Sequence, residues 1–178
     1  KKTYDLVYTA IFAILLAICS WISIPTVIPF TLQTFAVFLT LLVLGGKRGT
    51  SAFLVYLLLG AIGIPVFSNF GAGLGILLGN TGGYVLGFVL MGLLMWASDL
   101  LFGRKTLVQL ITLLLGLILC YAFGTFWFLF ISSNGGSDIA LTSVLGMCVL
   151  PFIVPDLCKL ALAYALSKRF RRMLAFQD

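Results

Sequence analysis

The chain alternates long apolar runs with short polar stretches. A helix needs about 20 residues to cross a hydrocarbon core of about 30 Å. The candidate runs cover approximately residues 4–24, 31–45, 49–64, 81–102, 106–131 and 149–170. The second and third runs are short for a full crossing, so we expect the irregular backbone beside them to be buried in protein or to line a cavity. The pattern predicts an all-α integral membrane protein with six transmembrane helices, folded as a single membrane domain over residues 1–178.

The composition agrees with this class and narrows the function. Hydrophobic residues make up 62% of the chain and charged residues 9%, against about 25% charged in a soluble domain. All five acidic residues are Asp, and the chain has no His, so it lacks most groups that serve acid–base catalysis or metal binding. The net charge of +6 comes from short clusters beside apolar runs and forms no basic face for nucleic acid. We therefore expect no enzyme, no catalytic residue, no metal, no cofactor and no nucleic-acid partner.

The basic residues also predict an orientation. Ten of the eleven Lys and Arg residues fall within Lys1–Lys2, Lys47–Arg48, Arg104–Lys105 and Lys168–Arg172. With six spans, these positions lie on one side of the membrane. Because Lys and Arg near span ends are retained on the cytoplasmic side, both termini are predicted to be cytoplasmic. The three opposite connections, 23–30, 65–82 and 132–150, carry no Lys or Arg, so a site open to the outside would be built from them.

The eleventh basic residue, Lys159, lies in the last span, three positions after Asp156. This spacing puts both side chains on one helix face, and Asp156 lies about 18 Å above Lys168, in the outer half of the membrane. A charge near a span centre costs about 2.5 to 3.5 kcal/mol on insertion scales. The pair is either a structural ion pair or the polar part of a ligand cavity. Pro155 favours the cavity, because a helix start or kink there would free backbone donors.

The second outer connection is rich in glycine. Small residues recur every four positions at Gly71, Gly75, Gly79, Gly83 and Gly87. Such spacing is typical of a helix-packing seam, but it also suits a backbone that approaches a ligand closely, for example at Gly82. Asn80 and Tyr84 add an amide and a phenol at the start of the fourth span, and a specific small-molecule site needs a few such groups.

The first outer connection is apolar and contains two prolines before it reaches Gln33. It has the features of a lid over a pocket and equally those of an interfacial loop with an aromatic anchor. Gln33, at the start of the second span, is a candidate polar contact for a ligand.

Ala13 and Ala17 lie one turn apart on the first span. Small residues at this spacing allow a close helix approach, within the bundle or against another protein, and the residues alone favour the internal contact. The chain has no P-loop, because Gly46-Lys47 is followed by Arg48. Any use of ATP would need another subunit.

Four segments carry a resemblance to a known family. They are Pro29–Gln33, Gly60–Phe67, Gly82–Phe88 and Pro151-x-x-x-Pro155-Asp156-x-x-Lys159. Together they resemble the BioY family, the biotin-specific substrate-capture (S) components of energy-coupling factor (ECF) transporters. The resemblance implies a six-helix S-component fold in the bacterial cell membrane, with biotin held near the outer face. It also implies a transmembrane coupling (T) protein and two ABC-type ATPases as partners, with Ala13 and Ala17 facing the T protein.

The chemistry of biotin fits these residues. A ureido ring offers two N–H donors and one carbonyl acceptor, so Asp156 can accept, Lys159 can donate and Asn80 can do either. The apolar ring and chain of biotin would contact Phe30, Val66, Phe67, Tyr84 and Trp127. Backbone N–H groups of the glycine-rich loop, or water, would meet the ligand carboxylate.

Three alternatives stay open from the residues. An S component for a flat aromatic vitamin, such as riboflavin or thiamine, would have no use for the Asp156–Lys159 pair. A stand-alone proton-coupled carrier could use Asp156, but the chain lacks repeat-related halves and has no further carboxylate away from the span ends. An intramembrane enzyme would need a Ser or Cys activated by Lys159, and no spacing points to one.

Overall fold

The computed structural model describes residues 2–24, 29–134 and 140–175. The longer helices are α1 (Lys2–Trp21), α2 (Gln33–Leu44), α3 (Gly46–Ala61), α5 (Gly82–Phe102), α6 (Thr106–Asn134) and α8 (Leu150–Ala175). The short elements are β1 (Ser23–Ile24), β2 (Phe30–Thr31), the 3-10 turn η1 (Ser68–Phe70), α4 (Leu74–Leu77) and α7 (Leu141–Cys148). Strands β1 and β2 pair antiparallel, with Ser23 opposite Thr31.

Within these described residues, four helical stretches are long and apolar enough to cross a membrane. They are Thr3–Trp21, Gly82–Phe102, Thr106–Asn134 and Leu141–Arg171. Helices α2 and α3, with 12 and 16 residues, rise only about 18 and 24 Å. The multi-pass helical class is therefore confirmed, and the count of six spans stays a prediction. The prediction of an irregular loop over residues 132–150 is wrong in part, because helix α7 forms there. This helix buries Val144 and Cys148 against Tyr84 and Phe128.

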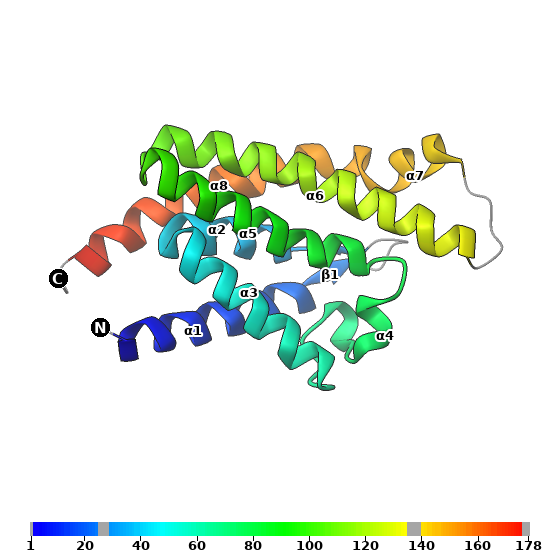
Figure 1. The fold of residues 1–178 in the computed structure, drawn as a ribbon, viewed down its shortest axis with the longest axis horizontal. Coiled ribbons are helices and arrows are strands. Elements are labelled where there is room, and N and C mark those ends of the chain that lie inside the picture. Colours follow the sequence, from blue (N-terminus) through cyan, green and yellow to red (C-terminus); the bar gives the residue numbers. More distant parts are fainter. Residues whose placement is uncertain (1, 25–28, 135–139, 176–178) are drawn as a thin grey trace.

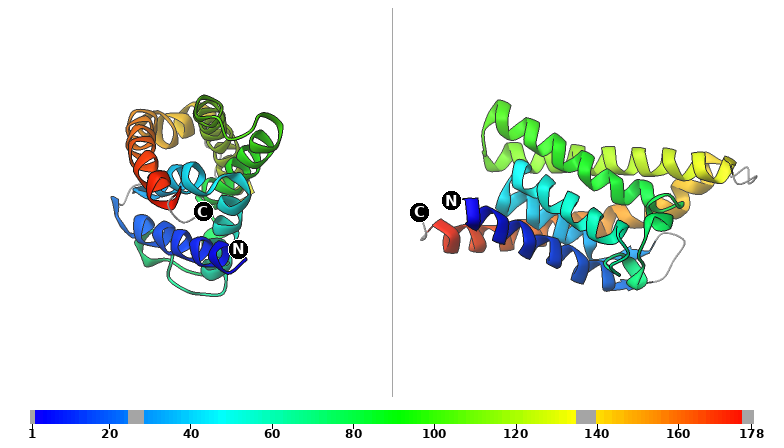
Figure 2. Two further views of the ribbon diagram at one scale, coloured as in Figure 1. Left: turned by 90° about the vertical axis from the view of Figure 1, so that its left-hand side faces the viewer. Right: turned by 60° about the horizontal axis from the view of Figure 1, so that its bottom comes forward.

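Both described ends of the chain lie at one end of the helical bundle (Figure 1). The α2–α3 and α5–α6 turns, which carry basic residues, lie at this same end, whereas the β1–β2 ribbon, α4 and α7 lie at the other (Figures 1 and 2). Helix α5 packs along α6, α8 along α2, and α3 between α1 and α5. Viewed from the end with the termini, α8 and the α5–α6 pair lie on different sides of the bundle (Figure 2, left).

The α5–α6 contact explains part of the glycine repeat. A Cβ on Gly83 would lie 2.3 Å from the Cβ of Trp127, and one on Gly87 would lie 2.7 Å from the sulfur of Cys120. These two glycines therefore allow α5 to approach α6 closely, as a packing seam predicts. Gly75 differs, because a Cβ there would meet nothing within 4 Å. The regularly spaced glycines thus serve different structures: Gly83 and Gly87 lie in the α5–α6 contact, whereas Gly75 lies where the chain leaves open space.

Helix α2 ends inside the protein, and two arginines complete its hydrogen bonds. The last carbonyls of a helix have no partner within the helix. The Arg171 guanidinium donates to the Leu42 carbonyl, with its Nε 2.7 Å away, and Arg104 donates to the Val43 carbonyl at 3.0 Å. These bonds allow a 12-residue helix to end among buried side chains.

Candidate ligand-binding site

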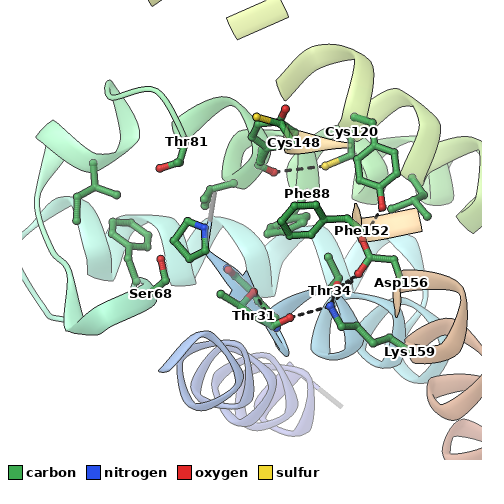
Figure 3. Close-up of a pocket in the computed structure, with 18 of the residues that line it drawn as sticks. Thr31, Thr34, Ser68, Thr81, Phe88, Cys120, Cys148, Phe152, Asp156 and Lys159 are labelled. Carbon is green, nitrogen blue, oxygen red and sulfur yellow. Dashed lines mark hydrogen bonds and ion pairs between the residues drawn. The ribbon is translucent and has the colours of Figure 1, made fainter. Parts of the chain in front are cut away.

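A pocket (Figure 3) is lined in part by residues of β2, η1 and the α4–α5 connection, which lie at the end of the bundle opposite the termini (Figure 1). It is lined by Pro29, Thr31, Gln33, Thr34, Tyr56, Phe67, Ser68, Ile76, Thr81, Tyr84, Val85, Phe88, Leu117, Cys120, Tyr121, Cys148, Phe152, Asp156 and Lys159. Its volume is about 730 Å³, including space open to solvent. Small-molecule sites typically have mainly apolar walls and a few polar groups, as this lining has.

The charged pair of α8 lies at one side of this pocket. The Asp156 and Lys159 residues are only 1% and 6% exposed, and the Lys159 Nζ lies 2.8 Å from the Asp156 Oδ1. Nζ also donates to the Thr31 carbonyl at 2.8 Å and to the Thr34 hydroxyl at 3.0 Å (Figure 3). An ammonium group has three N–H donors, so protein acceptors take all three. This arrangement offsets the cost of burying the cation.

The Asp156 carboxylate is held by three donors from three helices. Its Oδ1 accepts from Lys159 and from the Thr34 hydroxyl at 2.8 Å, and its Oδ2 accepts from the Tyr121 hydroxyl at 2.6 Å. The pair therefore connects α8 to α2, β2 and α6, and it also lines the pocket. The sequence posed a structural bridge and a cavity lining as alternatives, but the geometry combines them.

Pro155 acts differently from the expectation. It lies inside α8, five residues after the helix begins at Leu150. A proline has no N–H, so the Pro151 carbonyl loses its usual donor four residues later. The proline therefore frees an acceptor, and the prediction that it frees backbone donors beside Asp156 is wrong.

Two further predicted residues line the pocket. The Gln33 amide donates to the Tyr56 hydroxyl at 2.9 Å, and this hydroxyl donates to the Val66 carbonyl at 3.1 Å. The Tyr84 hydroxyl shares a hydrogen bond with the Thr125 hydroxyl at 3.3 Å. Val66 is buried behind this wall and is not among the lining residues. Gln33 and Tyr84 thus lie beside the pocket, and Val66 supports it through its carbonyl.

Phe30 lies at the edge of the charged pair. Its ring is 4.4 Å below the Lys159 ammonium, measured from the ring centroid, and its centroid is 5.6 Å from that of Phe152. The ring therefore shields the cation from one side and contacts Phe152, which lines the pocket, whereas Phe30 itself is not among the lining residues.

Asn80 and Gly82 lie outside the lining. Asn80 is exposed on the connection between α4 and α5. A Cβ on Gly82 would lie 1.8 Å from the Leu77 carbonyl oxygen, so the glycine allows a tight turn. Trp127, an expected wall, instead donates its indole N–H to the Gly79 carbonyl at 3.0 Å. The structure therefore gives Gly82 and Trp127 roles in packing this loop and leaves Asn80 on its surface.

Ala13 and Ala17 lie inside the bundle. They are 1% and 5% exposed and belong to the apolar core, while Ile11, Ile14 and Ile18 form the outward side of α1. The internal contact that the spacing favoured is confirmed. The two methyl groups are covered by the protein's own helices, and the contact of Ala13 and Ala17 with a T protein stays a prediction.

The sequence prediction missed Thr34 and Tyr121. Both line the pocket and donate to Asp156 across separations of 122 and 35 positions. The available signal was that each is a polar group within an otherwise apolar run.

These features define a class: a multi-pass helical membrane protein with an amphipathic pocket near one end, built around a buried ion pair that hydrogen bonds hold to three other elements. The chain belongs to the BioY family, whose sequence model matches residues 1–176.

Similar proteins agree with this assignment. The biotin transporter BioY of Thermotoga maritima is 39% identical over 172 residues, covering 95% of this chain and 96% of that protein. The biotin transporter BioY2 of Lactococcus lactis is 38% identical over 160 residues, covering 89% and 85%. A crystal structure of the S-component for biotin from an ECF-type ABC transporter matches with a TM-score of 0.82 and 29% identity, covering 96% of this chain and 92% of that one.

Proposed function

We propose that this chain captures biotin as the S component of an ECF-type uptake transporter, and that it is a binding subunit and not an enzyme. The observation that carries the proposal is the buried Asp156–Lys159 pair at the wall of an amphipathic pocket. Membership of the BioY family and the similarity to an S-component for biotin support the ligand and the role.

The ureido ring of biotin suits the pair. A carboxylate oxygen can accept about two hydrogen bonds. Asp156 Oδ2 accepts one, from the Tyr121 hydroxyl, so it can also accept one from a ligand N–H. Each N–H of Lys159 already has an acceptor. A ligand carbonyl must therefore replace one of these acceptors. We infer that it replaces the Thr31 carbonyl, because both groups are carbonyl oxygens. The thiophane ring and aliphatic chain would pack on Phe88, Leu117 and Phe152.

The proposal includes a topology. Six spans with both termini in the cytoplasm would place the pocket near the outer face of a bacterial cell membrane, among lipids. The basic turns at the end with the termini support this orientation, since cytoplasmic loops carry excess Lys and Arg. A T protein and two ABC-type ATPases would supply the energy, because this chain has no P-loop.

The test is equilibrium binding of biotin to purified protein in detergent, with riboflavin and thiamine as competitors. We expect tight binding by the wild type, weakened about tenfold or more by Asp156→Asn and by Lys159→Met, because each change leaves a buried partner unpaired. Lys168→Met is the matched control, an exposed lysine on the same helix at the opposite end of the bundle. No biotin binding by the wild type, or tight binding indifferent to both pocket variants, would refute the proposal.

A further inference from the structure

We propose that Tyr121 is a positioning residue for the ligand: it orients the Asp156 carboxylate so that the remaining acceptor position on Oδ2 is presented to a ureido N–H. This inference rests on the proposed capture of biotin. It assigns a role to a residue outside the four segments that carry the family resemblance.

The hydrogen bonds of the carboxylate make Oδ2 the available oxygen. Oδ1 accepts from both Thr34 and Lys159, and Oδ2 accepts from Tyr121. A carboxylate has about four acceptor positions, so these three donors leave one, on Oδ2. A ligand N–H must therefore bind beside the Tyr121 hydroxyl, on the same oxygen.

The donors to the two oxygens come from different sides of the pocket. Thr34 and Lys159 belong to α2 and α8, which pack along each other, whereas Tyr121 belongs to α6, which packs along α5 and has little direct contact with α8. The terminal torsion of an aspartate is broad, so donors to Oδ1 alone leave the carboxylate plane poorly defined. The Tyr121 hydroxyl, at 2.6 Å from Oδ2, fixes this plane from across the pocket.

The Tyr121 ring is itself held in place. It packs against both apolar clusters of the protein, one in the bundle core and one formed by Tyr84, Phe128, Val144 and Cys148. The hydroxyl therefore lies at a position set by packing, before any ligand arrives. Preorganisation of this kind reduces the ordering cost of binding.

The first test is a double-mutant cycle on biotin affinity, with purified wild type, Tyr121→Phe, Asp156→Ala and the double variant. We expect Tyr121→Phe to raise the Kd for biotin about tenfold, equivalent to about 1.4 kcal/mol. In the Asp156→Ala background the same change should alter the Kd by less than about twofold, because the carboxylate that it positions is gone. Tyr164→Phe, a matched tyrosine on α8 outside the pocket lining, should stay within about twofold of wild type, and thermal unfolding checks that each variant is folded.

A second test needs no change at Asp156. The Kd ratio of Tyr121→Phe to wild type is measured for biotin and for two analogues, each methylated on one ureido nitrogen. For the analogue that lacks the N–H bound by Oδ2, the ratio should fall from about tenfold to below about twofold.

Four results separate the two proposals. A Tyr121→Phe affinity within about twofold of wild type would overturn the positioning role, as would an equal loss in both Asp156 backgrounds. An unchanged ratio for both methylated analogues would also overturn it. Failure of the wild type to bind biotin would instead overturn the proposed function, and this inference with it.

Discussion

Replacing Lys159 by Met tests the central ion pair, because methionine keeps much of the apolar stem and removes the charge. The change leaves the Asp156 carboxylate, 1% exposed, with the hydroxyl donors Thr34 and Tyr121 but no cation. Removing one partner of a buried pair typically costs about 3 to 5 kcal/mol. Since two hydrogen bonds to the carboxylate remain, we expect Lys159→Met to lower the free energy of unfolding by about 3 kcal/mol, at the low end of this range.

The double variant Lys159→Met/Asp156→Asn separates stability from binding. It has no unpaired buried charge, so we expect it to recover at least about 2 kcal/mol of the loss. It should nevertheless bind biotin no better than either single variant, because neither ligand contact is restored.

The assay is denaturant titration of the purified protein in detergent micelles, followed by biotin binding on the same samples. Lys168→Met is again the control, and we expect it to lie within about 0.5 kcal/mol of wild type. A free energy of unfolding for Lys159→Met that is less than about 1 kcal/mol below the wild-type value would refute the reasoning. So would a double variant no more stable than the single one.

Three further predictions concern packing and hydrogen bonds around the site. Gly87→Val should destabilise the protein by about 1 to 3 kcal/mol by overpacking the α5–α6 contact at Cys120; unaltered denaturation would contradict this. Tyr56→Phe removes a hydroxyl that links α2 to the wall of the pocket, and should lower the free energy of unfolding by about 1 to 2 kcal/mol in the same titration. Arg171→Ala should cost about 1 to 3 kcal/mol, because the Leu42 carbonyl loses its donor. Its biotin affinity should stay within about twofold of wild type, since Arg171 lies far from the pocket end; a larger change in Kd would show coupling between the two ends.

Local properties of the sequence determined the class of protein and the centre of its site. Hydropathy over some 20 residues is set within each segment, so the helical membrane class and most helix positions could be predicted within a few residues. The spacing of Asp156 and Lys159 is also local, because one helical turn brings positions three apart onto the same face. The alternation of basic and uncharged connections likewise indicated which connections share an end of the bundle, as the fold confirms.

Tertiary packing decided how that pair is satisfied and which neighbours reach the pocket. Lys159 bonds to Thr31 across 128 positions, and Asp156 bonds to Tyr121 across 35. No local pattern encodes such contacts, because they depend on how α2, α6 and α8 pack together. The same packing turned Ala13 and Ala17 inward, since α1 buries its small residues against its neighbours and presents isoleucines outward. The sequence by itself therefore specified the elements and the charged pair, whereas long-range helix packing determined the shape of the pocket and the partners of its charges.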